Sequence, residues 1–435
     1  MDQTVVEILD LVRENDVKFI RLAYCDLFGQ QKNMAIMSSQ LERAFQEGIA
    51  FDASAVKGFR TVNCSDLFLV PDASTVSILP WRPAHERVMR MDCDVKNPDG
   101  TDFTGYSRYI LRAAAQRCAD MGYICNIGTE CEFYLFRTDE RGEPLHLPLD
   151  RGTYNDVAPL DRGENVRREI CLAIEEMGLL PERSHHERGP GQNEIDFRYA
   201  DALSTADHLL IFKLAAKAIA AQNGLYASFM PKPFLEESGN GLHINLSLSK
   251  GGRNLFQQGN HHSADMESFI AGILERVREI SVFLNPLTNS YRRLGAFEAP
   301  KYITWSHQNR SQLIRIPASN HENTRMELRS ADPACNPYLA FALLLHAGLD
   351  GIERRVKLEP PCNENLYETK GVSYPTLPNS LTQAVELAKQ SEFLARVLPL
   401  ETLQRYIKEK EEQGRRFDQE KDQWEFEHQS YFEWI

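Results

Sequence analysis

The stretch Arg325-Met326-Glu327-Leu328-Arg329 alternates charged and apolar side chains. At the two-residue period of a β-strand, the three charged side chains lie on one face, and Met326 and Leu328 lie on the other. An antiparallel sheet can bury its apolar face and expose the opposite face. The stretch therefore predicts a strand with one buried apolar face and one face that carries three charged side chains, and those charges require an explanation.

Other segments repeat this pattern with residue types that bind metals and anions. The polar positions are Glu130 and Glu132 in GTECEFYLF (128–136), His243, Asn245 and Ser247 in GLHINLSLS (241–249), His185, Glu187 and Glu194 in SHHERGPGQNEIDFRY (184–199), and Arg310 and Arg315 in NRSQLIRIP (309–317). Each segment alone could be an ordinary strand with a solvated outer face. Together, a set composed almost entirely of Glu, Arg and His indicates a curved antiparallel sheet that carries one polar site.

The candidate metal ligands form a hard-oxygen donor set. They are the five carboxylates Glu130, Glu132, Glu187, Glu194 and Glu327, with His243 as the nitrogen donor and no thiolate. Such a set favours Mg²⁺ or Mn²⁺ over zinc. Crowded carboxylates repel one another unless cations lie between them, and two ions could bridge these. The arginines could then bind phosphate groups and a carboxylate substrate.

Composition and charge exclude several other functions. The net charge is -13, which disfavours nucleic acid or an anionic membrane as the main partner. The nine cysteines include no Cys-x-x-Cys pair, which is typical of a reducing cytoplasm. The acidic, amphipathic first residues predict no signal peptide. The longest apolar run, which begins at Tyr338, is too short to span a bilayer and predicts a buried helix.

The length and one strong turn predict two domains. At 435 residues the chain is too long for a single hydrophobic core. Asn97-Pro98-Asp99-Gly100 is a turn signal. We expect an α+β protein with a small, mostly β domain over residues 1–98 and a larger domain over residues 99–435, which ends in a charged helical tail. The sequence contains neither a P-loop nor the kinase motifs, so any nucleotide is bound in another way.

Eight blocks resemble the glutamine synthetases, in particular the short, alpha-like type I form of bacteria and archaea. In chain order they are FDASAVKGF (51–59), GTECEFYLF (128–136), HHERGPGQNE (185–194), SFMPKPF (228–234), GNGLHINLSL (239–248), NPLTNSYRRL (285–294), FEAPKYITWSHQNRSQLIRIP (297–317) and RMELRSADPACNPYLAFALLLHAGLDGI (325–352). The resemblance spans nearly the whole chain. It implies a β-grasp-like N-terminal domain before a catalytic domain built on a curved antiparallel sheet flanked by helices.

The resemblance also implies roles for individual residues. Glu132, Glu187 and Glu194 would hold one divalent ion, and Glu130, His243 and Glu327 a second, with two or three Mg²⁺ or Mn²⁺ ions per site. Arg310, Arg315, Arg325, Asn245 and Ser247 would bind ATP, and Arg293, Arg329 and Gly239 would bind glutamate. Asp52 of a neighbouring subunit would deprotonate ammonium, and Glu298 would lie on a flap that excludes water. His185 is either a nucleotide contact or an ordinary histidine.

The activity that the resemblance implies is ATP-dependent formation of glutamine through γ-glutamyl phosphate. Asp52 and Glu298 are retained, but four features depart from the family pattern. Ala55 replaces a serine, Ser238 to His243 lose an asparagine, the flap before Pro300 is one residue shorter, and Thr61 stands where a feedback arginine is usual. A γ-glutamyl ligase for methylamine, ethanolamine or a polyamine is therefore the alternative.

A non-catalytic, glutamine-sensing member of the family is a third interpretation, although a complete ligand set argues against it. A phosphagen-type kinase would not need the block that carries Asp52. The resemblance further implies a cytoplasmic homo-oligomer of stacked rings, such as a dodecamer, with sites between subunits. Tyr367 stands where longer members are modified, and we expect no modification in this short form.

Overall fold

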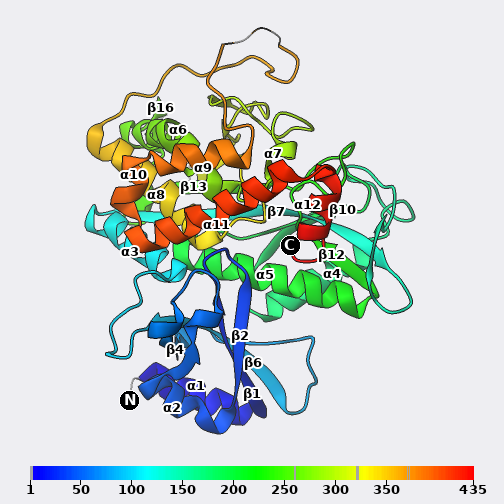
Figure 1. Ribbon diagram of the computed structural model, residues 1–435, viewed down its shortest axis with the longest axis vertical. Helices are drawn as coiled ribbons and strands as arrows, with labels where there is room; N and C mark the ends of the chain where they lie inside the picture. Colours follow the sequence, from blue (N-terminus) through cyan, green and yellow to red (C-terminus); the bar gives the residue numbers. More distant parts are fainter. Residues whose placement is uncertain (1–2, 259–260, 320–322, 370, 372) are drawn as a thin grey trace.

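The computed structural model describes residues 3–258, 261–319, 323–369, 371 and 373–435, and it has an α+β fold. A smaller N-terminal part, blue in Figure 1, lies below a larger part that contains most of the helices. Each part is built around its own sheet. The α+β fold expected from the sequence is confirmed.

The N-terminal sheet has six strands in the order β2-β1-β6-β4-β3, with β5 beside β6. Its strands are β1 Val17–Cys25, β2 Gln31–Met37, β3 Ile49–Asp52, β4 Asp66–Pro71, β5 Ser77–Ile78 and β6 Arg87–Lys96. Strands β1 and β6 run parallel. Helices α1 (Gln3–Glu14) and α2 (Leu41–Glu47) accompany this sheet, and α1 buries Ile8 and Val12 because their spacing places them on one side.

The larger sheet carries the faces that the sequence indicated. The main path runs β17-β18-β19-β13-β7-β10-β9, and every described strand pair in it is antiparallel except β17 with β18. Its strands are β7 Ile124–Thr138, β8 Pro144–Pro148, β9 Pro181–His186, β10 Gln192–Phe197, β11 Ala200–Asp201, β12 Leu225–Ser228, β13 Leu242–Lys250, β14 Arg253–Asn254, β17 Trp305–His307, β18 Ile314–Ile316 and β19 Met326–Leu328. A short hairpin, β15 Gln257–Gln258 with β16 His261–His262, lies apart from it.

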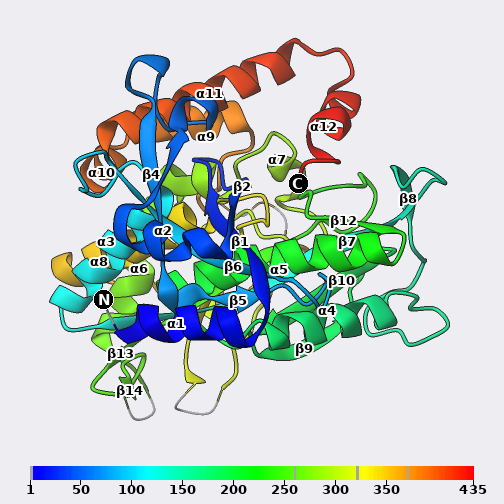
Figure 2. The same ribbon diagram turned by 90° about the horizontal axis from the view of Figure 1, so that it is seen from below.

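Helices cover the sheet and complete the core (Figures 1 and 2). They are α3 Ser107–Asp120, α4 Glu164–Glu176, α5 Ala202–Gln222, α6 Ala264–Leu284, α7 Ser290–Arg293, α8 Pro337–Arg354, α9 Leu381–Lys389, α10 Glu392–Val397, α11 Leu400–Gln419 and α12 Gln423–Tyr431. The Asn336 side chain caps α8 by accepting a hydrogen bond from the Tyr338 amide. As expected from its apolar run, α8 is buried, and no described helix is long and apolar enough to cross a membrane.

Helices α6 and α8 pack against each other at a pair of glycines. A Cβ atom on Gly272 would lie 2.3 Å from the Ala347 carbonyl oxygen and 2.7 Å from the Gly351 Cα atom. Only glycine allows the two helix backbones to approach this closely.

A buried ion cluster, which we call the junction cluster, connects the two parts of the chain. Arg108 on α3 lies 2.8 Å from carboxylate oxygens of Asp72, Asp94 and Asp207. The Tyr338 hydroxyl donates a further 2.6 Å hydrogen bond to Asp207. The buried charges of this cluster are therefore paired within the fold.

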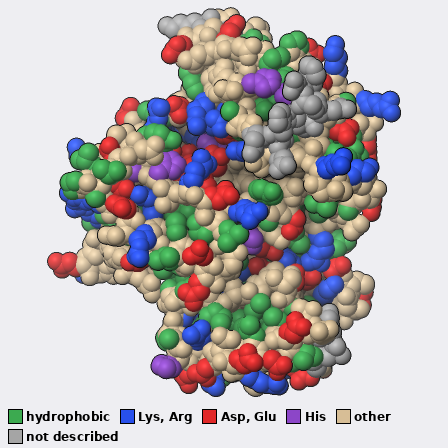
Figure 3. All heavy atoms as spheres, turned by 180° about the vertical axis from the view of Figure 1, so that it is seen from behind, with side chains coloured by type: hydrophobic (Ala, Val, Ile, Leu, Met, Phe, Trp, Pro, Cys, Tyr) green, Lys and Arg blue, Asp and Glu red, His purple; other side chains and the backbone are tan. Residues whose placement is uncertain are grey.

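The molecular surface mixes charges of both signs. On the face shown in Figure 3, acidic and basic side chains are interspersed over both parts of the molecule. Any anion that binds must therefore be held by local groups of arginines.

Candidate active site

Strand register brings the predicted polar residues together. His243 pairs with Glu130, and Asn245 pairs with Glu327. On the other side of β7, Glu194 pairs with Glu132. Because side chains of paired residues lie on the same face, strands β10, β7, β13 and β19 form one continuous polar surface.

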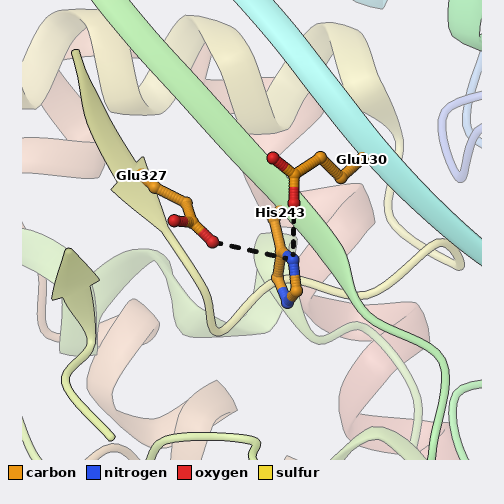
Figure 4. Close-up of side chains that lie close together, drawn as sticks. All are labelled: Glu130, His243 and Glu327. Atoms are coloured by element: carbon orange, nitrogen blue, oxygen red, sulfur yellow. Dashed lines mark hydrogen bonds and ion pairs between the residues drawn. The ribbon is translucent and has the colours of Figure 1, made fainter. Parts of the chain in front are cut away.

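The first group contains Glu130, His243 and Glu327, and Figure 4 shows the imidazole between the two carboxylates. The His243 Nδ1 atom lies 3.3 Å from Glu130 Oε2 and 3.7 Å from Glu327 Oε1. Burial, followed by the charge of Arg329, lowers the pKa of His243. Burial opposes ionisation of Glu130, but the hydrogen bond and the charge of His243 together lower its pKa. The three residues thus offer two anionic oxygen donors and one imidazole nitrogen.

The second group contains His185, Glu187 and Glu194. His185 Nε2 lies 3.0 Å from Glu187 Oε1 and 3.9 Å from Glu194 Oε1. Glu132 borders this group, and burial together with the charge of Glu187 raises its pKa to about 8. Burial, Asp196 and Glu132 raise the pKa of Glu194 well above its usual value. The resemblance implied Glu132 for this group and left the role of His185 open, and in the structure His185 lies close to both Glu187 and Glu194.

The donor chemistry of both groups fits a divalent cation. In each group, three potential ligand atoms lie within 4.8 Å of one another. Burial and mutual repulsion disfavour the charged forms of Glu132 and Glu194, and a cation among them would offset both effects. Carboxylate oxygens with one nitrogen per group suit Mg²⁺ or Mn²⁺.

A third group with similar spacing, Asp150, Asp161 and His186, has a structural explanation. Asp150 accepts hydrogen bonds from the Gly152, Arg162 and Gly191 amides and contacts His186 Nε2 at 2.9 Å. Asp161 is bound by both terminal nitrogens of Arg167. Protein donors satisfy these carboxylates, so the group braces the loop that carries Glu187.

Arginines surround the first group. Glu327 is fully buried, and its two oxygens lie 2.5 Å from Arg315 Nε and 2.6 Å from Arg329 Nη1. Arg293, at the end of α7, donates to the Ser330 and Arg329 carbonyl oxygens. The charges of the predicted RMELR strand are therefore explained by a buried carboxylate between arginines that face a pocket.

The pocket at this surface has a volume of about 250 Å³. The predicted residues that line it are Glu130, Glu132, Glu187, Glu194, Gly239, His243, Arg293, Glu298, Arg310, Arg315, Arg325 and Arg329. A Cβ atom on Gly239 would lie 2.5 Å from the Pro231 carbonyl oxygen, so this wall of the pocket requires glycine.

A second pocket of about 460 Å³ adjoins the first. Asn245, Ser247 and Arg325, which the resemblance implies would bind ATP, line this pocket. Arg325 donates to Asn245 Oδ1 at 2.9 Å, and Asn245 donates in turn to Glu130. The polar side chains of the second pocket are thus linked directly to the first group.

Asp52 lies outside both pockets. It ends β3 in the N-terminal part, and its exposed carboxylate accepts hydrogen bonds from the Ser54 amide and hydroxyl. Arg60, beside the expected feedback position, donates to Asn97 and lies over the Phe103 ring, so its guanidinium has partners within the same chain. Within one copy of the chain, neither residue reaches the acids and arginines.

Several pocket residues were not singled out from the sequence. Arg183 pairs with Asp196 at 2.6 Å and lines both pockets. Tyr199 lies beyond the end of β10, half exposed in the larger pocket, although strict alternation placed it on the apolar face. Arg188 and Tyr154 line the smaller pocket. Arg183 and Arg188 flank His185 and Glu187 in the sequence, and this proximity to predicted site residues was the signal that could have identified them.

Comparisons with known proteins agree with this geometry. The family model of the glutamine synthetase β-grasp domain matches residues 16–98, and that of the glutamine synthetase catalytic domain matches residues 104–429. Glutamine synthetase of Clostridium saccharobutylicum is 46% identical over 404 residues, covering 91% of each chain. Glutamine synthetase of Methanosarcina mazei is 46% identical over 419 residues, covering 94% of this chain and 93% of the relative.

A solved structure described as a GmaS/ADP complex also resembles this chain. It superimposes with a TM-score of 0.88 at 30% identity and covers 97% of this chain and 98% of its own. The fold and site define a ligase with a β-grasp domain and a curved antiparallel catalytic sheet. The chain belongs to the glutamine synthetase family. The relatives' names do not favour the alternatives of another amine acceptor or a non-catalytic sensor.

Proposed function

We propose that this protein catalyses the ATP-dependent ligation of glutamate and ammonium to glutamine. The observation that carries the proposal is that the two pockets share Glu130, Arg183 and Arg325. A nucleotide in the larger pocket would thus direct its phosphates toward the acids and arginines of the smaller one. The ADP in the described structural neighbour supports a nucleotide on this fold.

Two or three Mg²⁺ or Mn²⁺ ions would be held by the two groups of acids. Glu130, His243 and Glu327 would hold one, while Glu132, Glu187 and Glu194 would hold another, with His185 beside them. Bound there, the ions would neutralise negative charge on the transferred phosphoryl group. Asn245, Ser247 and Arg325 would hold the nucleotide.

The remaining polar residues bind glutamate and stabilise charge. Arg293, Arg329 and the backbone at Gly239 would orient glutamate so that its γ-carboxylate oxygen attacks the γ-phosphorus of ATP, the bond from that phosphorus to the bridging oxygen breaks, and ADP leaves. Arg310 and Arg315 would stabilise the transferring phosphoryl group. Ammonia would then attack the carbonyl carbon of γ-glutamyl phosphate, the bond from that carbon to the phosphate oxygen would break, and phosphate would leave.

Asp52 supports an assembly with sites between subunits. It lies apart from the pockets of its own chain, so a neighbouring copy would supply it as the base that takes a proton from ammonium. A homo-oligomer with inter-subunit sites follows from this. The matches at 16–98 and 104–429 support the division into domains 1–98 and 99–435. All nine cysteines are free thiols, which supports a cytoplasmic location.

The test is Mg²⁺-dependent phosphate release from ATP with glutamate, titrated with ammonium and with methylamine, ethanolamine and a polyamine. Mass spectrometry identifies the products. We expect glutamine, with the highest kcat/KM for ammonium. A higher kcat/KM for a substituted amine would overturn the proposed acceptor, and no phosphate release with any acceptor would overturn the ligase assignment.

A further inference from the structure

A tight turn with unusual backbone angles covers the smaller pocket. Phe297 has φ 47° and Glu298 has φ 68°, both in the left-handed region that residues other than glycine rarely adopt. The Gly295 amide donates to the Ala299 carbonyl oxygen at 2.8 Å and closes the turn. Such angles persist only where surrounding contacts fix them, so this turn must be held from outside.

Two cations from different parts of the chain contact the two strained residues. The Lys232 ammonium lies 4.1 Å from the centre of the Phe297 ring, and Arg188 Nη2 lies 2.7 Å from Glu298 Oε1. The Lys232 ammonium also donates to the Glu237 carbonyl oxygen, and its backbone amide donates to Asn289 Oδ1 at 2.7 Å. Lys232 is therefore a fixed anchor for Phe297.

The segment that carries Arg188 is also anchored. The Arg188 amide donates to Glu187 Oε2, and the Gly189 amide donates to Gln192 Oε1, both at 2.9 Å. On the other side of the turn, Arg329 Nη2 lies 3.4 Å from the Glu298 carbonyl oxygen. Glu298 is thus held through its side chain by Arg188 and through its backbone by Arg329.

We propose that Arg188 is a positioning residue that holds the Glu298 carboxylate over the smaller pocket and so favours ammonia over water as the acceptor. The inference deepens the proposed function and rests on it. Attack by ammonia breaks the bond from carbon to phosphate oxygen and gives glutamine, and the proton lost by the nitrogen passes to the released phosphate. Attack by water gives glutamate and phosphate, so ATP is hydrolysed without synthesis. Arg188 acts only through Glu298.

The ratio of phosphate released to glutamine formed measures this partition. The variants are Arg188→Ala, Arg188→Met and Arg188→Lys, assayed at limiting ammonium with saturating ATP, glutamate and Mg²⁺. The matched control is Arg415→Ala, because Arg415 is also 57% exposed and forms a 2.7 Å ion pair with a partly exposed glutamate, Glu412, on α11. Thermal melting identifies any variant that has not folded.

We expect Arg188→Ala and Arg188→Met to raise the ratio by between about twofold and fivefold, the equilibrium change expected from loss of an exposed ion pair. Arg188→Lys keeps the positive charge and should therefore give a ratio close to that of the wild type. In a Glu298→Gln background, Arg188→Ala should change the ratio no further. Arg415→Ala should match the wild type.

Folded Arg188→Ala and Arg188→Met variants with the wild-type ratio would overturn the positioning role, and so would a further change in the Glu298→Gln background. If neither variant folds, Arg188→Gln, which also lacks the charge but keeps a polar side chain, decides the question by the same ratio. A wild-type protein that makes no glutamine would instead contradict the proposed function, because that result does not depend on Arg188.

Discussion

The junction cluster and the active-site pocket are both built from arginines and carboxylates, but they differ in how their charges are balanced. At the junction, Arg108 contacts three aspartates, and Tyr338 donates to one of them. In the pocket, Glu132 and Glu194 lie so close to other acids that burial and repulsion raise the pKa of both. Burial and the charge of Asp92 also raise the pKa of Asp207, to about 6, but Arg108 and Tyr338 bind this carboxylate directly. The junction therefore already holds its cation, whereas the acids of the pocket would gain one from a bound metal ion.

This difference separates structural ion pairs from functional ones. Removing one partner of a buried ion pair destabilises the fold, because the remaining charge is left buried and unpaired. Acids that lie near one another without enough positive partners destabilise the unliganded protein, and a bound cation removes that repulsion. The same chemical change should therefore have opposite consequences in the two clusters.

The largest expected effect is on catalysis. Glu132→Gln removes a carboxylate that would bind the cation and should lower kcat/KM for glutamine formation at least about 100-fold, because metal ions supply several kcal/mol of charge stabilisation. In the absence of metal, its free energy of unfolding near pH 7 should equal or exceed that of the wild type, because Glu132, with a pKa of about 8, must take up a proton on folding and glutamine need not. Steady-state kinetics and urea unfolding measure both. A strongly destabilised variant would contradict the proposed difference.

The matched change at the junction is Asp207→Asn. It leaves Arg108 buried without one of its bound carboxylates and should cost about 3–5 kcal/mol of stability, the usual loss on breaking a buried ion pair. Folded enzyme should keep its rate per active site, because Asp207 lines neither pocket of the proposed site. Chemical denaturation with active-site titration tests this. An unchanged midpoint would show that the junction cluster does not stabilise the fold.

Metal binding offers a third comparison. Adding Mg²⁺ to metal-free protein at 100 times its Kd should raise the free energy of unfolding by about 2.7 kcal/mol for each site. Asp207→Asn should keep this increment, while Glu132→Gln should lose much of it. Thermal melting with and without EDTA measures the change. An equal increment in both variants would mean that the ion binds elsewhere.

The smallest effect concerns His346 on α8, a buried imidazole that the fold keeps neutral. Burial, with the charges of Arg117 and Arg396, lowers the pKa of His346 to about 4, and Arg117 Nη1 lies 2.9 Å from its Nδ1 atom. The unfolded chain binds this proton near pH 6.5, so stability is present above that pH and is lost as pH falls toward 4.

The loss attributable to His346 should reach about 1 kcal/mol by pH 5.5, since one pKa unit corresponds to roughly 1.4 kcal/mol. His346→Gln should remove this part of the pH dependence. Urea unfolding at pH 7.5 and at pH 5.5, on the wild type and the variant, gives the difference directly. Equal slopes in the two proteins would show that the proton binds elsewhere.

Local patterns in the sequence indicated individual helices and strands and the chemistry of the polar face. The spacing of Ile8 and Val12 predicts α1, and alternation around Glu130, His243 and Glu327 predicts strands with a shared chemistry. These features depend on periods of 3.6 and 2 residues, which neighbouring positions alone define. Alternation failed at Tyr199, because β10 ends at Phe197 and the next residues follow the turn toward α5.

The sequence by itself determined the donor chemistry, the family resemblance and the order of the two domains. Only the tertiary structure decided that His185 lies close to both Glu187 and Glu194, that Arg188 reaches Glu298, and that Asp52 stands outside the pocket of its own chain. Residue types and short periods follow from local sterics and polarity. Contacts between distant segments depend instead on strand register and on packing across the core, which no short stretch of sequence contains.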